Sequence, residues 1–231
     1  MEKWLIGEIF TSINGEGRKA GQLAVFIRLI GCNLNCSYCD TAWARVPGEN
    51  GTWMTTEQVM DYVKESKVHN ITITGGEPLL TAELDKLLDA LYELEHIQVE
   101  IETNGAVDIA EMKKRSKSPS MTVDYKLPSS GMEQFMYMPN FQIVDENDTV
   151  KFVCGSREDL QRAKQIIEEY QLVGKTAVYF SPVFEKLSGD EIVEFMKQEN
   201  LNGVNLQLQL HKMIWEPDAR ENKYIIHIEY E

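Results

Sequence analysis

Three of the four cysteines, Cys32, Cys36 and Cys39, lie in one short stretch with the spacing C-x3-C-x2-C. Thiolates this close can hold one inorganic centre, and soft sulfur ligands favour iron–sulfur clusters or zinc. A [4Fe–4S] cluster bound by three cysteines leaves one iron open to a substrate or cofactor. A structural zinc site needs four protein ligands, and cysteines also serve as small buried residues or, in secreted chains, as disulfides. The spacing alone leaves these alternatives open.

A second motif, Gly75-Gly76-Glu77-Pro78, follows a short β-branched run at residues 70–74. Glycines let the backbone approach a ligand closely and expose its hydrogen-bonding groups. The motif by itself also fits an ordinary tight turn. Its place one strand–helix unit after the cysteines makes it more specific.

Strands and helices alternate along the whole chain. Apolar or β-branched runs predict strands at 4–10, 23–29, 70–74, 99–103, 122–126, 149–153, 176–181 and 204–210. Helices are predicted from Thr55, where Thr55 and Gln58 form a capping box, and near 84–91, 109–115, 157–170 and 188–199. Residues 128–147 look irregular. This alternation predicts a largely parallel α/β sheet.

In parallel α/β folds the chemistry gathers at the carboxyl ends of the strands. We expect five polar residues to lie there: Arg28, Thr74, Glu102, Lys126 and His211.

The composition is that of a globular protein, with 231 residues, 43% hydrophobic and 26% charged, and we expect one domain over 1–231. No apolar run approaches the roughly 20 residues that a membrane span needs. No signal peptide is recognisable, so the expected location is the cytoplasm. The net charge of -14 argues against binding to nucleic acid or to anionic membranes. The basic run from Lys113 to Lys117 is interpreted as a solvated helix end.

With these motifs the chain resembles the radical S-adenosylmethionine (SAM) superfamily, and within it the 7-carboxy-7-deazaguanine synthases. The likeness runs from residue 8 to about 215 and includes Asn14-Gly15-Glu16-Gly17, Phe26-Ile27-Arg28, Gly31-Cys32-Asn33-Leu34, Cys39-Asp40-Thr41, Glu102-Thr103-Asn104-Gly105 and Gln209-Leu210-His211-Lys212. It implies a partial, open TIM-type β/α barrel with about six parallel strands.

The resemblance also implies the cofactors. Cys32, Cys36 and Cys39 would hold a [4Fe–4S] cluster whose open iron binds SAM, and cleavage of SAM would yield a 5′-deoxyadenosyl radical. The implied SAM contacts are Gly76, Glu102, Asp124, Tyr125 and Lys126. The family shows a Ser-Pro-Lys or similar triplet at 124–126, and only the lysine matches. Cys154 is interpreted as a buried small residue.

The implied reaction is that of a lyase converting 6-carboxy-5,6,7,8-tetrahydropterin to 7-carboxy-7-deazaguanine, a queuosine precursor, with loss of ammonia. Arg28 would bind the substrate carboxylate, assisted by His211. Thr74 and the loop residues Ile13, Asn14, Gly15 and Glu16 would contact the pterin. Thr41 would contribute a hydroxyl to Mg²⁺.

The segment after Trp215 departs from the family pattern. Residues 216–231 form an atypical tail beyond a core of about 4–215, and could add an extra strand or an interface strand. The tail and the family favour a homodimer, and a flavodoxin or ferredoxin would donate the electron. Two alternatives stay open: a radical SAM activase that places a glycyl radical on a partner enzyme, and a non-catalytic zinc-binding interaction module.

Overall fold

The chain folds around one nine-stranded sheet with the order β3-β1-β2-β4-β5-β6-β7-β8-β9. A computed structural model describes residues 2–48 and 50–215, so the predicted tail at 216–231 lies outside the described residues. The strands are β1 (Lys3–Ile13), β2 (Leu23–Leu29), β3 (Thr52–Thr55), β4 (Asn70–Gly75), β5 (Gln98–Thr103), β6 (Ser120–Tyr125), β7 (Thr149–Cys154), β8 (Ala177–Pro182) and β9 (Val204–Leu206). All neighbours from β2 to β9 pair in parallel, whereas β1 pairs antiparallel with β2 and β3.

Side chains alternate strictly between the two faces of this sheet, as the period of two requires. One face carries the core residues, with Val25 and Ile27 on β2, Ile71 and Ile73 on β4, and equivalent apolar pairs on the later strands, all buried. The other face carries polar side chains at the alternate positions of each strand: Arg28, Thr72, Thr74, Glu100, Glu102, Thr122, Asp124, Lys151 and Ser181. The polar face is therefore the place to look for chemistry.

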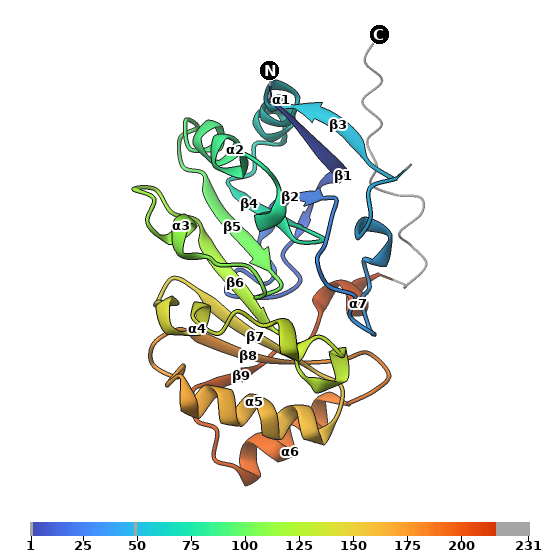
Figure 1. Cartoon of the computed structure of the whole chain (residues 1–231), viewed down its shortest axis with the longest axis vertical. Helices are drawn as coiled ribbons and strands as arrows, with labels where there is room; N and C mark the ends of the chain where they lie inside the picture. Colours follow the sequence, from blue (N-terminus) through green and yellow to red (C-terminus); the bar gives the residue numbers. More distant parts are fainter. Residues whose placement is uncertain (1, 49, 216–231) are drawn as a thin grey trace.

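Helices cover the apolar face. Figure 1 shows the sheet curving from β3 to β9, with the main helices outside the curve and α7 inside it. The helices are α1 (Thr56–Ser66), α2 (Leu84–Leu91), α3 (Ala110–Lys113), α4 (Asn140–Ile143), α5 (Arg157–Glu169), α6 (Gly189–Gln198) and α7 (Leu210–Ile214). Short 3₁₀ turns lie at Ala42–Ala44, Pro78–Leu80, Pro128–Ser130 and Glu133–Phe135. The capping box of Thr55 and Gln58 is confirmed at the start of α1.

Three stretches differ from the sequence predictions. The short strand β3 was not predicted, and the irregular segment at 128–147 contains α4 and two 3₁₀ turns. The predicted strand at 204–210 ends at Leu206, and α7 begins at Leu210. The alternating apolar residues suggest a longer strand, but the Gln207 side chain turns inward to accept a hydrogen bond from the Gly17 N–H at 2.6 Å. The Gln207 N–H still donates to the Phe180 carbonyl of β8 at 2.8 Å, and regular pairing ends there.

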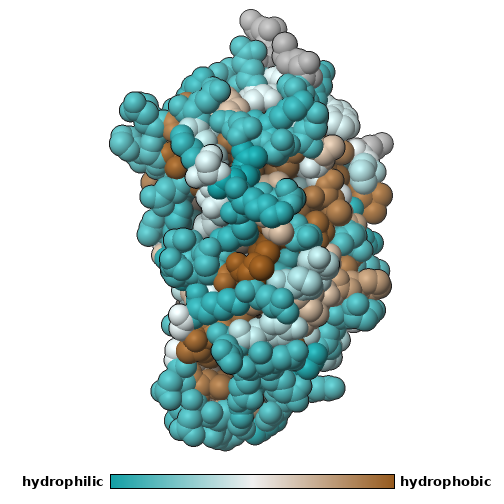
Figure 2. Space-filling view, turned by 60° about the vertical axis from the view of Figure 1, so that its left-hand side comes forward, coloured by the Kyte–Doolittle hydropathy of each residue, from teal (hydrophilic) through white to brown (hydrophobic). Residues whose placement is uncertain are grey.

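The outer surface is largely hydrophilic in the view of Figure 2. The basic run is neutralised locally, since Lys113 pairs with Asp145 and Asp148, Lys114 with Glu111, and Arg115 with Asp89. The run is less solvated than predicted, because the side chains of Lys113 and Arg115 are only 13% and 19% exposed. Among the described residues, no helix is long and apolar enough to span a membrane.

Candidate active site

The cysteine loop leaves the carboxyl end of β2 and is anchored at its start. Gly31 and Cys32 donate their N–H groups to the carbonyls of Ala44 and Arg45, at 2.8 and 2.9 Å. Cys39 in turn donates its N–H to the carbonyl of Cys36. The pKa of the Cys36 thiol is raised, first by burial, while Lys126 opposes the shift and the neighbouring Cys39 and Cys32 add to it. The three thiols therefore lie close enough to influence one another.

Gly75 and Gly76 pack the end of β4 against this loop. A Cβ on Gly75 would lie 2.1 Å from the Leu29 carbonyl oxygen, and one on Gly76 would lie 2.2 Å from that of Gly31. The Glu77 N–H donates to the Gly31 oxygen at 2.7 Å. The Gly76 N–H donates to the Leu29 carbonyl oxygen. The carbonyl of Gly76 is therefore the backbone group that could accept a hydrogen bond from a cationic amine.

Glu77 and Asn104 connect the two motifs to β5. The buried Glu77 carboxylate accepts hydrogen bonds from the Thr103 hydroxyl at 2.8 Å and the Asn104 N–H at 2.6 Å. The Asn104 side-chain amide donates to Asn33 Oδ1 at 2.8 Å and to Cys32 Sγ at 3.6 Å. Asn104 thus contacts Cys32, a predicted cluster ligand, from a neighbouring strand, and hydrogen bonds to a ligating sulfur tune metal–sulfur centres.

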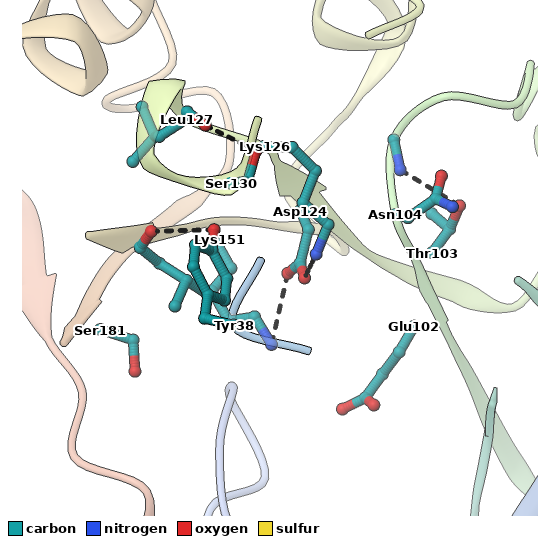
Figure 3. A network of polar contacts seen from close by, with 12 residues as sticks. Tyr38, Glu102, Thr103, Asn104, Asp124, Lys126, Leu127, Ser130, Lys151 and Ser181 are labelled. Atoms are coloured by element: carbon teal, nitrogen blue, oxygen red, sulfur yellow. Dashed lines mark hydrogen bonds and ion pairs between the residues drawn. The ribbon is translucent and has the colours of Figure 1, made fainter. Parts of the chain in front are cut away.

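Glu102 and Asp124 point from adjacent strands toward a common space (Figure 3). Glu102 accepts a hydrogen bond from the Thr74 hydroxyl at 2.8 Å, so a predicted SAM contact and a predicted substrate contact meet. Asp124 pairs with Lys126 at 2.7 Å. The Tyr125 side chain lies on the opposite face, where its ring contacts Phe141 in the helix-side core. Alternation along β6 therefore leaves only the backbone of Tyr125 near the site, and its predicted SAM contact would have to be made by that backbone.

The two carboxylates differ in electrostatics. Burial raises the pKa of Glu102; Lys151 opposes this, and the negative charges of Glu100 and Glu16 add to it. Burial would also raise the pKa of Asp124, but Lys126 and Lys151 outweigh it and hold that pKa below its ordinary value. Asp124 is therefore held in its ionised form, whereas a cation beside Glu102 would favour ionisation of that carboxyl.

The loop between β1 and β2 lies at the amino end of β2 and reaches into this space from there. At its base, Asn14 accepts a hydrogen bond from the Thr72 hydroxyl at 2.9 Å. The Gly15 carbonyl accepts from the Leu210 N–H, and a Cβ on Gly15 would lie 2.5 Å from His211 Nδ1. Ile13 is the last residue of β1. The predicted substrate residues of the loop and α7 are therefore neighbours.

Arg28 lies on the polar face at the end of β2, as predicted, but it already has a carboxylate partner. Its Nε donates to Glu8 Oε1 of β1 at 2.6 Å, since the two residues are opposite each other in the antiparallel pair. The bond uses one edge of the guanidinium, and the terminal amino groups remain for a second carboxylate.

Thr41 follows the last cysteine of the loop at the start of the 3₁₀ turn. Its hydroxyl contacts Asp40 Oδ1 at 3.2 Å and makes no capping bond to the turn. Within the described residues, no three His, Cys, Asp or Glu side chains converge as closely as a single metal ion requires.

Comparison with known proteins decides the family. Residues 27–198 match the radical SAM superfamily. The chain is 50% identical to a 7-carboxy-7-deazaguanine synthase of Clostridium acetobutylicum, over 92% of this chain and 96% of that one. It is 38% identical to the enzyme of the same name from Chlorobaculum tepidum, over 93% and 96%.

The chain belongs to the 7-carboxy-7-deazaguanine synthase family of radical SAM proteins.

Solved structures agree with this fold. Escherichia coli QueE matches with a TM-score of 0.71 at 21% identity, covering 90% of this chain and 94% of that one. Streptococcus suis SuiB, bound to a precursor peptide, matches with a TM-score of 0.54 and 16% identity, over 77% of this chain and 46% of that one. The predicted open β/α barrel of the radical SAM kind is confirmed.

The radical SAM family implies a [4Fe–4S] cluster and SAM, and the residues present fit both. Three soft thiolates on one loop suit iron–sulfur ligation, and each thiolate of such a cluster binds a separate iron. The acids of the polar face, Glu102 and Asp124, complement the cationic amine and sulfonium of SAM.

Several residues that shape this site are absent from the sequence predictions. Lys151 and Ser181 both contact Glu16, and Asn104 contacts Cys32. In the sequence, Lys151 and Ser181 are single polar residues inside apolar strands. The only signal in the sequence is a polar residue inside an otherwise apolar strand, at a position that alternates with the core residues.

Proposed function

We propose that the chain is a lyase that converts 6-carboxy-5,6,7,8-tetrahydropterin to 7-carboxy-7-deazaguanine, a step toward queuosine. The observation that carries this proposal is the meeting of two sets of residues on one polar face. Thr74, a substrate residue, donates to Glu102, a SAM residue, at 2.8 Å. Cofactor and substrate would therefore bind side by side, as a radical abstraction requires.

When bound, the cluster and SAM would supply the radical chemistry that removes a hydrogen atom from the substrate. Cys32, Cys36 and Cys39 would hold the cluster, and the Gly76 carbonyl would accept from the SAM amine. Glu102 and Asp124 would accept hydrogen bonds from SAM, with Lys126 orienting Asp124 at 2.7 Å. Tyr125 would contribute through its backbone.

The substrate contacts come from the loop and the strand ends. The terminal amino groups of Arg28 would bind the substrate carboxylate, with His211 beside the loop. Glu16 and the backbone of Ile13, Asn14 and Gly15 would pair with the amino and amide edge of the pterin, which offers N–H donors to a carboxylate.

Four finer points complete the proposal. Thr41 would offer its hydroxyl to a Mg²⁺ ion that keeps several waters, as magnesium prefers. The enzyme would act as a homodimer in the cytoplasm. A flavodoxin or ferredoxin would donate the electron. One domain would span 1–231.

The test is a product assay with anaerobically reconstituted protein, the pterin substrate, SAM and a reductant. We expect a brown protein with about four irons per chain and formation of the deazapurine. Cys36→Ala should lose both, whereas Cys154→Ala, a buried cysteine outside the loop, should keep both. SAM cleavage without deazapurine would refute the synthase and favour the glycyl-radical activase. A colourless zinc protein would favour the interaction module.

A further inference from the structure

A buried lysine links the loop that faces the substrate to the strand that faces SAM. Lys151 lies on the polar face of β7, and its side chain is only 10% exposed. Its Nζ donates to Glu16 Oε2 at 3.0 Å and lies 3.3 Å from Asp124 Oδ1. Figure 3 shows Lys151 reaching to Asp124, with Glu102 directed toward the same space. Burying one cation between two carboxylates requires close pairing with both.

Glu16 has a second partner on the next strand. The Ser181 Oγ lies 3.2 Å from Glu16 Oε1 and 3.0 Å from the Gln207 carbonyl oxygen, so these two acceptors share its one proton. Both oxygens of Glu16 are therefore held by side chains of β7 and β8. Glu16 itself is more than a hundred residues away in sequence, so its position is determined by tertiary contacts.

The base of the loop does not depend on these contacts. The Asn14 N–H donates to the Gln22 carbonyl, and the Gly21 N–H to the Asn14 carbonyl, each at 2.8 Å. Between them, the tip is attached through the Glu16 carboxylate and through the Gly17 N–H on Gln207. Removal of Lys151 would leave the base and the backbone contacts of Gly15 and Gly17 formed. It would free one oxygen of the Glu16 carboxylate, with Glu16 and Asp124 no longer separated by a cation.

We infer that Lys151, supported by Ser181, is a positioning residue that sets the Glu16 carboxylate for the substrate. The inference rests on the proposed function for the identity of that substrate. Without Lys151 the substrate would be held loosely, and SAM cleavage would lead less often to product. A misplaced substrate loses rate steeply even when each cofactor binds normally.

The test compares Lys151→Met with the wild type in two measurements. Hydrogen–deuterium exchange on the cluster-free protein should show faster exchange at residues 15–19, with the distant strands unchanged. In the reconstituted enzyme the substrate KM should rise by about tenfold or more. The amount of product per 5′-deoxyadenosine should fall several-fold while iron content stays at the wild-type level. Lys151→Arg should restore much of the slow loop exchange and of the product ratio. Ser181→Ala should change both quantities in the same direction as Lys151→Met, but by less.

The matched control is Lys113→Met. Lys113 also bridges two carboxylates, Asp145 and Asp148, with a side chain 13% exposed, but on α3 away from the polar face. It should lose stability and keep the wild-type loop exchange and product ratio. Equal loop exchange and product ratio in Lys151→Met and the wild type would overturn the inference. The same changes in Lys113→Met would do so as well, because they would report general destabilisation.

Failure of the inference and failure of the proposed function are distinguishable. A wild type that makes no deazapurine refutes the function, and the exchange measurement still tests the contact of Lys151 with the loop. If Lys151→Met does not fold, Lys151→Arg and Ser181→Ala carry the same comparison. Wild-type loop exchange in Ser181→Ala, together with an unchanged product ratio, would then contradict the inference.

Discussion

Glu102 and Glu100 lie two residues apart on the same face of β5, yet they have different surroundings. Glu100 is buried beside Thr122, whose hydroxyl donates to it. Glu102 bonds to Thr74 nearer the carboxyl end of the strand, where the residues predicted to bind SAM lie. In the sequence, the two acids are equivalent strand residues and only the resemblance selects Glu102. Both acids accept a hydrogen bond from a threonine hydroxyl, so this contact does not distinguish them, and the role of Glu102 in SAM binding stays a prediction.

The raised pKa of Glu102 predicts a pH dependence of SAM binding. Below this pKa the carboxyl is protonated and accepts hydrogen bonds from SAM poorly. As the pH rises through it, the carboxylate forms and SAM affinity should increase. Glu102→Gln should remove this rise and weaken binding about tenfold at the high-pH end. The measurement is the Kd of SAM against pH in the reconstituted protein.

Glu100→Gln is the matched control on the same strand. It should keep the rise in SAM affinity but shift it to lower pH, because Glu100 is one of the charges that raise the pKa of Glu102. A flat pH profile in the wild type would contradict the prediction.

At the scale of the element, the glycine pair at the end of β4 determines how closely two loops approach. An alanine at Gly76 would place its Cβ 2.2 Å from the Gly31 oxygen and 3.0 Å from Cys32 Cβ. The cysteine loop would have to move, which should cost about 1–3 kcal/mol of stability. Gly76→Ala should therefore assemble the cluster poorly, as iron content per chain and thermal unfolding will report.

Gly48→Ala is the control for this change, since the nearest atom to its Cβ is the Val46 oxygen at 4.0 Å. It should keep wild-type iron content and stability. A Gly76→Ala protein with a full complement of iron and unchanged stability would show that the close approach is not needed.

Elements whose cause is local could be predicted from sequence. The capping box at Thr55 and the β-branched run at 70–74 are such cases. The bend of the β1–β2 loop onto β7 and β8 could not, because it depends on pairs such as Glu16 with Lys151, distant in the chain. The pairing of Arg28 with Glu8 is similar, since it follows from the register of an antiparallel pair that no local pattern encodes.

At the scale of the whole molecule, the β1–β2 loop joins the two ends of an open sheet. β1 lies near one edge, beside β3, and β9 is the other edge. The loop contacts Thr72 on β4 through Asn14, and it contacts Gln207, just after β9, through Gly17. The first and last parts of the described chain are thereby held together across the polar face, so they should unfold together.

This predicts one cooperative unfolding transition. Three of the four tryptophans, Trp4, Trp43 and Trp53, lie in the first part of the chain, so tryptophan fluorescence is weighted toward β1 and β3. Far-UV circular dichroism is weighted toward helices such as α5 and α6. Their thermal transitions should coincide. Gln207→Ala removes the 2.6 Å bond to Gly17 and should lower stability by about 1 kcal/mol, or roughly 2–4 °C in Tm, equally for both probes. A transition that splits in the wild type, or a shift in Gln207→Ala confined to one probe, would mean that the two halves of the sheet fold independently.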